Sequence, residues 1–438
     1  MSGMRFKSKQ YRWYVLGVLA LTYAFSFMDR QILSILLEDI RAEFSLSDLQ
    51  LGLLSGIAFA LFYATLGIPI ARLADRFNRV RIVSAAVAIW SAMTALCGAA
   101  SSFWQLFLAR VGVGIGEAGG SPPSHSIISD YFNKDERSFA LAIYSLGTSF
   151  GMLFGLVMGG FVAEFYGWRW AFVCAGVPGL ALALLLKFTV REPLRGAMED
   201  TKQPPRPAPA DSESIIAAFR ALWSNRCYRF VNLAHMLGVF VGYGFTVWKP
   251  PLYLRQFDLS QSEVGLIVGL TAAGLGVPGI LLGGYLADRL SKRDARGPAW
   301  LCASAVLVAI PFYLLALWSS DWVVTTIFIG MGVFLYSLSH APGLAIVQTV
   351  VEPHRRAQAA AYVFFLANML GLGLGPVLVG SLSDAFAAQF DNRSLNAALG
   401  CVTLVLFAAA AMYWRTAQAL RRSDYMDAST KNRRGYQR

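Results

Sequence analysis

Long apolar segments alternate with short polar segments over most of the chain. A helix needs about 20 apolar residues to cross about 30 Å of hydrocarbon. The pattern therefore predicts twelve membrane-spanning helices, at residues 13–36, 49–70, 80–99, 103–126, 138–163, 169–190, 228–253, 262–286, 298–318, 322–346, 357–380 and 394–415.

Basic residues gather in alternate loops and at the chain ends. They stand in the N-terminal tail, after the second span and after the eighth span: Arg5, Lys7, Lys9 and Arg12; Arg72, Arg76, Arg79 and Arg81; Arg289, Lys292, Arg293 and Arg296. Loops on the cytoplasmic side carry this excess. Both termini are therefore expected in the cytoplasm, and the protein in the plasma membrane, which is the inner membrane if the chain is bacterial.

Composition and motifs argue against a soluble protein, a nucleic-acid partner and an enzyme. Of the 438 residues, 56% are apolar and only 15% are charged, whereas soluble domains carry about 25% charged residues. The net charge of +12 follows the loops, so no nucleic-acid partner is expected. The sequence has no phosphate-binding GxxxxGK[ST] loop and no metal-ligand spacing of His or Cys. We therefore expect no cofactor, no metal and no enzyme activity.

A polar segment divides the chain. TKQPPRPAPAD, at 201–211, is typical of an extended linker, and an amphipathic stretch from Ile215 to Trp223 follows it. The stretch fits a helix at the membrane interface or a short soluble helix packed on a neighbouring loop. The predicted parts are a six-helix bundle at 1–190, the linker at 191–227, a second bundle at 228–420 and a basic tail at 421–438.

The two bundles share an internal repeat. SLSDLQLGLLSG at 45–56 aligns without gaps to DLSQSEVGLIVG at 258–269, and ARLADRFNRVR at 71–81 aligns to GYLADRLSKRD at 284–294. Two six-helix halves in parallel repeat are typical of secondary transporters.

The repeated loop carries a family signature. Its copies are Ala71, Leu73, Asp75, Arg76, Asn78 and Arg79, then Gly284, Leu286, Asp288, Arg289, Ser291 and Lys292. They resemble the G-x-L-x-D-R-x-G-R-x loop of the major facilitator superfamily, which implies an all-α fold of twelve spans in two pseudo-symmetric halves. Asp75 and Asp288 would act with Arg76, Arg79 and Arg289 as a conformational latch on the cytoplasmic side. Alternatively, the loops are only a topology signal.

Four ionisable residues break the repeat. Asp29, Arg30, Arg110 and Glu117 fall within predicted spans and align with uncharged residues of the second half. Each such group costs roughly 2.5–3.5 kcal/mol at a helix centre on insertion scales, so it is functional by default. Counting about 1.5 Å per residue places Asp29 level with Arg110, and we expect these two to pair. The alternative is a static ion network that joins the first and fourth spans.

The sequences around these residues narrow the resemblance. SFMDRQ at 26–31 and LARVGVGIGEAGGSPPS at 108–124 look like the Spinster-type branch of the superfamily, in a bacterial member. In that branch, the corresponding Asp-Arg pair, Arg and Glu belong to the central site. The resemblance implies a lipid-like substrate, of the lysophospholipid or sphingosine-phosphate class.

The chemistry suits that class. Arg30 and Arg110 can bind an anionic headgroup, Asp29 and Glu117 can carry protons, and Tyr243 and Tyr336 can contribute cavity wall. We expect a monomeric, proton-coupled transporter that works by alternating access. Its partners would be protons, a small-molecule or lipid substrate and membrane lipids. Glycines of the fifth span, Gly151, Gly155, Gly159 and Gly160, resemble those of exporters and favour export, although Leu156 stands where exporters usually carry a proline. Alternatively, these glycines only allow close helix packing. A proton-coupled organic-anion or sugar-acid carrier and an uncoupled lipid facilitator or scramblase stay open.

Overall fold

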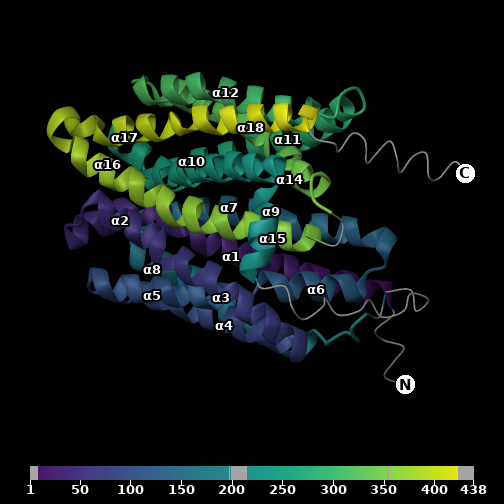
Figure 1. Ribbon diagram of the computed structural model, residues 1–438. Coiled ribbons are helices and arrows are strands. Elements are labelled where there is room, and N and C mark those ends of the chain that lie inside the picture. Colours follow the sequence, from purple (N-terminus) through teal and green to yellow (C-terminus); the bar gives the residue numbers. More distant parts are fainter. Residues whose placement is uncertain (1–7, 197, 199–214, 353–354, 423–438) are drawn as a thin grey trace, which may run out of the picture. The chain divides into compact units, whose positions relative to one another are not determined.

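The computed structural model describes residues 8–196, 198, 215–352 and 355–422. Within these ranges the elements are helices joined by short turns, and no strand occurs (Figure 1). The all-α prediction is confirmed. The predicted linker at 201–211 and nearly all of the basic tail lie outside the described residues.

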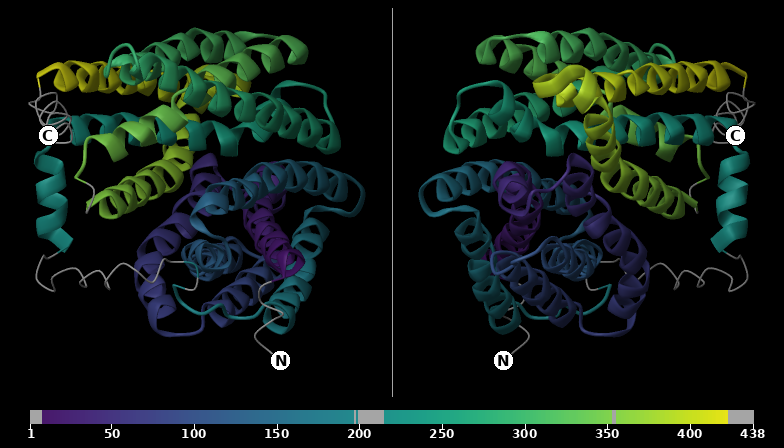
Figure 2. Two further views of the ribbon diagram at one scale, coloured as in Figure 1. Left: turned by 90° about the vertical axis from the view of Figure 1, so that its right-hand side faces the viewer. Right: turned by 90° about the vertical axis from the view of Figure 1, so that its left-hand side faces the viewer.

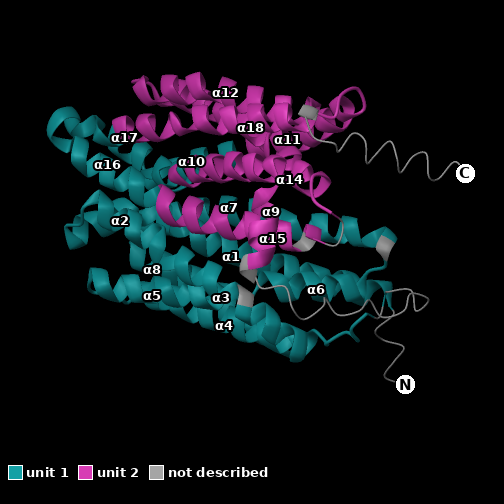
Figure 3. Cartoon of the chain, viewed as in Figure 1, with its two compact units in different colours: residues 1–207, 245–273, 376–395 teal, residues 208–244, 274–375, 396–438 magenta. Residues whose placement is uncertain are grey.

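The chain forms two compact units (Figure 3). Unit 1 comprises residues 1–207, 245–273 and 376–395, and unit 2 comprises 208–244, 274–375 and 396–438. The two units are defined by spatial contacts, whereas the predicted bundles are defined by the sequence repeat. Segments 245–273 and 376–395 therefore belong to unit 1, although they lie in the second predicted bundle.

Unit 1 contains the first eight helices. They are α1 (Lys9–Phe44), α2 (Asp48–Ser55), α3 (Ile57–Arg76), α4 (Arg79–Cys97), α5 (Phe103–Glu117), α6 (Ser121–Tyr131), α7 (Lys134–Tyr166) and α8 (Trp168–Thr189). It also holds one end of α10 (Arg226–Gln256) and of α11 (Gln261–Ser291), and nearly all of α16 (Gly375–Phe390).

Unit 2 contains the remaining helices and the other ends of α10 and α11. They are α9 (Ile215–Ser224), α12 (Gly297–Trp318), α13 (Trp322–Ser337), α14 (His340–Thr349), α15 (Arg356–Leu366), the π-helix η3 (Ala367–Leu374), α17 (Ser394–Thr403) and α18 (Val405–Arg422).

Local sequence sets the helix ends. Ser47 and Gln50 form a capping box at the start of α2, in which each side chain bonds the other's main-chain N–H. Asn133 accepts a hydrogen bond from the main-chain N–H of Glu136 at 2.9 Å and so begins α7. Gly167 has a φ of +87°, which favours glycine, and separates α7 from α8.

The fourth predicted span is two helices. α5 ends at Glu117 and α6 begins at Ser121, with prolines in its first turn. Proline lacks the N–H that an interior position needs, but the first turn does not use it. The break places Glu117 at a helix end in the middle of the apolar segment.

Helices α1 and α7 pack along each other in unit 1 (Figure 2). Small residues at every fourth position of α7 face α1, and a Cβ added to Gly155 would lie 2.8 Å from the main-chain oxygen of Met28. Glycines at this spacing let two helix backbones approach closely. The glycine pattern of the predicted fifth span therefore holds α1, and with it Asp29 and Arg30, against α7.

Nine helical segments of the described chain are long and apolar enough to cross a membrane. One of them, Gln358–Leu420, runs through both of the last two predicted spans, and the fourth span is divided at Glu117. The count of twelve stays a prediction.

Helix α9 packs against α15 within unit 2. The Phe219 ring meets Tyr362 edge-on at 5.2 Å, and Ala218 and Leu222 are buried. The stretch thus forms a helix that packs on another helix, and its place at the membrane interface stays a prediction.

Candidate functional site

The four ionisable residues that break the repeat come together in unit 1. Asp29 and Arg30 lie in the middle of α1, and Arg110 and Glu117 lie on α5. The exposed fraction is 1% for Asp29, 1% for Arg110 and 2% for Glu117. Two potential cations and two potential anions therefore share one interior region.

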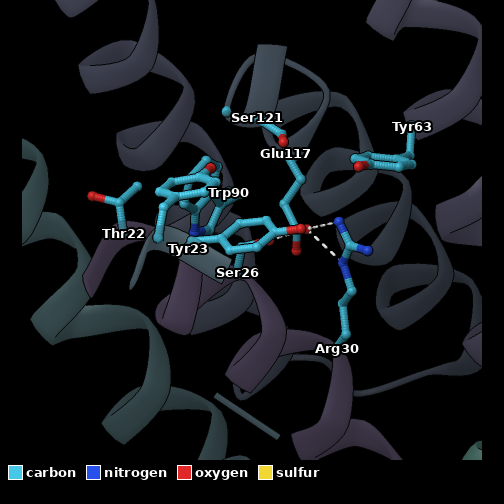
Figure 4. A pocket seen from close by; sticks show the side chains of 10 residues that line it. Thr22, Tyr23, Ser26, Arg30, Tyr63, Trp90, Glu117 and Ser121 are labelled. Atoms are coloured by element: carbon cyan, nitrogen blue, oxygen red, sulfur yellow. Dashed lines mark hydrogen bonds and ion pairs between the residues drawn. The ribbon is translucent and has the colours of Figure 1, made fainter. Parts of the chain in front are cut away.

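Arg30 and Glu117 form the central ion pair (Figure 4). The Arg30 Nε and Nη2 atoms each lie 2.7 Å from Glu117 Oε2, and the Ser26 hydroxyl donates to the same oxygen at 2.7 Å. One carboxylate oxygen thus accepts two hydrogen bonds and makes a further ion-pair contact with the same guanidinium.

Aromatic rings surround the Arg30 guanidinium. Its central carbon lies 4.8 Å from the Phe27 ring centroid, 4.7 Å from that of Phe59 and 4.5 Å from that of Tyr63. A cation over a ring face is stabilised by the ring quadrupole. The aromatic surroundings give this cation apolar neighbours and keep much of the water away from it.

Asp29 and Arg110 do not pair as the depth estimate predicts. Thr94 donates to Asp29 Oδ2 at 3.0 Å, while Arg110 Nη1 donates to the main-chain oxygen of Asp29 at 3.3 Å. Consecutive helix residues point about 100° apart, and rotation about α1 turns Arg30, rather than Asp29, toward the acid of α5. The predicted Asp29–Arg110 ion pair is therefore wrong.

Several polar atoms of this cluster have no partner. Asp29 Oδ1, Glu117 Oε1 and Arg110 Nε are buried without a hydrogen bond to any residue that the structure describes. A buried polar atom without a partner costs about 1–3 kcal/mol, and more if it is charged. Within the described residues, Asp29 and Glu117 each use only one carboxylate oxygen in side-chain hydrogen bonds, and the static ion network stays an alternative.

A small pocket adjoins the ion pair. Its lining, drawn in Figure 4, is Thr22, Tyr23, Ser26, Arg30, Tyr63, Trp90, Glu117, Gly120, Ser121 and Tyr144. The volume open to the centres of water molecules is about 10 Å³, enough for about one water. The described ranges contain no group of three or more His, Cys, Asp or Glu side chains that could hold a metal ion.

Tyr243 and Tyr336 lie in unit 2. The Tyr336 ring of α13 packs on the α10 backbone. A Cβ added to Gly238 would lie 3.1 Å from this ring, and a Cβ added to Gly242 would lie 3.4 Å from it. It also meets the His340 ring edge-on at 4.9 Å. A shared cavity with the Arg30–Glu117 pair stays a prediction.

Arg79, from the signature loop, is buried in unit 1. Its guanidinium pairs with Asp130 of α6 at 2.5 Å and with Glu192 after α8 at 2.6 Å. It also donates to the Ser126 hydroxyl and to the main-chain oxygen of Pro193. This network joins α4, α6 and the segment after α8.

The other predicted latch residues are exposed. Arg289 stacks on Tyr285, with its central carbon 4.7 Å from the ring centroid, and the side chains of Asp75 and Asp288 form no ion pair within the part of the chain that the structure describes. A latch role for Asp75, Arg76, Asp288 and Arg289 stays a prediction.

Sequence reasoning missed a second ion cluster of unit 1. Arg255 of α10 donates to Asp48 through Nη1 and Nη2, both at 2.7 Å, and to Glu38 through Nε and Nη2, at 2.9 and 2.7 Å. The Ser383 hydroxyl of α16 also donates to Asp48, at 2.6 Å. Arg255 is a single arginine in a loop that the sequence predicts between two spans. Its role in an ion cluster becomes visible only when its partners are known.

A further ion pair closes the end of α1. Arg169 donates to both oxygens of Glu43 at 2.6 Å, and the Trp168 indole N–H donates at 2.8 Å. These hydrogen bonds, first the one from Arg169, hold the pKa of the Glu43 carboxyl below its ordinary value.

Comparison with known proteins adds family information. The profile of the Major Facilitator Superfamily matches residues 19–376 and again 231–431. An MFS-type efflux pump of Mycolicibacterium smegmatis is 34% identical over 94% of this chain and 94% of its own. The sphingosine-1-phosphate transporter SPNS2 of Danio rerio is 29% identical over 86% of this chain and 77% of its own.

One solved structure is also similar over nearly the whole chain. It is a bacterial homolog of the human lysosomal transporter Spinster, in an inward-facing and unoccupied conformation. The identity is 32%, the TM-score is 0.85, and the match covers 94% of this chain and 98% of the other.

Proposed function

Because the chain belongs to the Major Facilitator Superfamily, as a multi-pass membrane transporter of the Spinster type, we propose that it moves an amphipathic anion in exchange with, or together with, protons. The substrate is of the lysophospholipid or sphingosine-phosphate class, and the bound anion sits at the Arg30–Glu117 pair. A monomer carries the substrate across the bacterial inner membrane by alternating access.

One observation carries the proposal. Arg30 is held by a single carboxylate oxygen of Glu117, while Asp29 and Glu117 each keep one buried oxygen without a described partner. An oxygen in that state is a costly place for negative charge. A proton on Glu117 would release Arg30 for an anion, and the departure of the anion would return Arg30 to Glu117. Proton and substrate are thus linked through one guanidinium.

The surroundings of Arg30 support an amphipathic substrate. Phe27, Phe59 and Tyr63 offer apolar contact beside the cation, and a guanidinium binds phosphate through two parallel hydrogen bonds. The pocket holds only about one water in this conformation, so binding requires it to widen. The printed activity of the SPNS2 relative, sphingosine-1-phosphate transport, agrees with this substrate class.

We propose export as the direction. The α7 glycines that contact α1 match the pattern expected for exporters, and the relative from Mycolicibacterium smegmatis is named as an efflux pump. Because the proposed mechanism binds the proton and the anion together, both move in the same direction, and outward flux is expected when the substrate gradient points outward. No outward flux under that gradient would overturn this part alone.

The test is transport in proteoliposomes. Purified protein is reconstituted with lysophosphatidylglycerol or sphingosine 1-phosphate, and flux is followed with and without a pH gradient. Glu117→Gln and Asp29→Asn should each abolish the dependence on the gradient, while Glu263→Gln, an exposed acid at the start of α11, should behave as the wild type.

Each alternative has its own outcome. Lipid flux that ignores the gradient and both variants would leave an uncoupled facilitator or scramblase. Gradient-dependent flux of organic anions or sugar acids, with none of the lipids, would favour the hydrophilic-anion carrier.

A further inference from the structure

A groove runs between α12 and α18 on the surface of unit 2. Its lining is Trp300, Ala303, Ser304, Leu307, Phe407, Ala410, Ala411, Trp414, Arg415 and Gln418. Small side chains form the floor, because α12 and α18 pack closely there: Ala303 and Ala410 are buried. The volume is about 600 Å³, within the about 300–1,000 Å³ of small-molecule sites.

The walls of the groove are large and outward-facing. Leu307 is 46% exposed, Phe407 51% and Trp414 49%. Both helices belong to segments apolar enough to span a membrane, so these side chains face hydrocarbon rather than water. A soluble ligand would not reach them, but an acyl chain would.

The groove has a polar end and an apolar end. The Trp300 and Trp414 rings meet edge-on, 4.2 Å apart, at one end, and Arg415 and Gln418 lie beside them. Leu307 and Phe407 lie seven residues along their helices, about 10 Å away at 1.5 Å per residue. Tryptophan marks the depth of lipid headgroups in a bilayer. The polar end and the apolar end of the groove thus match the headgroup and the acyl chain of one lipid molecule in a single leaflet.

Arg415 supplies the charge at that end. It is exposed and forms no ion pair with any residue in the described ranges. A guanidinium free to bind a phosphate lies next to a side-chain amide donor, above an apolar channel. By charge complementarity, the occupant that satisfies both ends is an anionic phospholipid.

We propose that the α12–α18 groove is a binding site for an anionic phospholipid, distinct in its residues from the Arg30–Glu117 pocket. The acyl chain lies over Ala303 and Ala410 between Leu307 and Phe407, and Arg415 binds the headgroup phosphate. The positive-inside pattern assigns this end of α12 and α18 to the cytoplasmic leaflet.

The test is native mass spectrometry of the full-length protein from vesicles of equal phosphatidylglycerol and phosphatidylcholine. The wild type should retain phosphatidylglycerol selectively. Arg415→Gln should lower its occupancy about fivefold, the equivalent of about 1 kcal/mol for one cation near the surface. Ala411→Leu, which fills the groove and keeps the charge, should lower it as well.

The control is Arg293→Gln, which removes an exposed cation of the loop before α12. It should retain phosphatidylglycerol as the wild type does. Equal retention of both lipids, no retention, or equal losses in Arg293→Gln and Arg415→Gln would overturn the site. A dimer that Ala411→Leu dissociates would show that a second copy covers the groove instead. If Ala411→Leu fails to fold, the two arginine variants decide.

Discussion

Replacing Arg255 with glutamine removes the cation that joins α10 to the acids of α1 and α2. The Asp48 side chain is 3% exposed, Arg255 14% and Glu38 20%. Without Arg255, the buried Asp48 carboxylate keeps the Ser383 hydroxyl and a long contact to Arg41 at 3.7 Å. We expect the variant to be clearly less stable than the wild type.

The magnitude follows from burial. Removing one partner of a fully buried ion pair costs about 3–5 kcal/mol. Arg255 and Glu38 are partly exposed and Ser383 stays in place, so we expect a smaller loss, roughly 2–3 kcal/mol. At about 2.1 cal/mol/K per residue, the unfolding entropy of a 438-residue chain is about 0.9 kcal/mol/K, so this loss corresponds to roughly 2–3 °C in the thermal midpoint.

The assay is thermal unfolding in detergent, followed by tryptophan fluorescence. Arg41→Gln is the matched control, because its side chain is 43% exposed and it lies 3.6 Å from Glu38, a pair worth about 0–1 kcal/mol. A midpoint for Arg255→Gln equal to that of Arg41→Gln would refute the reasoning. A double variant with Asp48→Asn should lose less than the sum of the single losses, because the two residues are in contact.

Three further outcomes are expected. Because the pKa of Glu43 is lowered, its pair with Arg169 stabilises the fold fully above the ordinary value near 4.5, and this contribution disappears as the pH falls through the lower folded pKa. In Glu43→Gln the fall of the thermal midpoint between about pH 6 and about pH 3 should be smaller than in the wild type, and an equal fall would contradict the pair. Gly155→Leu should cost about 1–3 kcal/mol by overpacking α1 against α7, whereas Gly17→Leu, with open space around it, should melt as the wild type. Arg79→Gln leaves Asp130 and Glu192, whose side chains are 11% and 23% exposed, without their buried cation and should lower the midpoint clearly below that of the wild type. An unchanged midpoint would show that the acids find other partners.

The repeat and the hydrophobic pattern were sufficient to predict an all-α transporter and to single out Asp29, Arg30, Arg110 and Glu117. Charges in apolar helices are expensive, and their absence from the second repeat separates them from structural residues. The structure gathers these four in unit 1, as the sequence predicts.

The pairing within that group was beyond the sequence. Depth follows from counting residues, but the partner of Arg30 depends on the rotation of α1, which arises from packing. The aromatic neighbours Phe59 and Tyr63 show the same limit, because many aromatic residues at helical spacing face lipid. Arg255 was missed because a single arginine in a loop has no pattern until Asp48, distant in sequence, lies beside it.

The Arg79 network has a consequence for biosynthesis. Its guanidinium is nearly fully buried, and its partners come from α6 and from Glu192 and Pro193, directly after α8. A ribosome must therefore synthesise more than a hundred further residues before Arg79 can find its full set of partners. Until then, a charged residue at the start of α4 has to stay near water. Arg79 can therefore become fully buried only when the first eight helices are complete. A nascent chain arrested before residue 192 should keep Arg79 accessible to solvent.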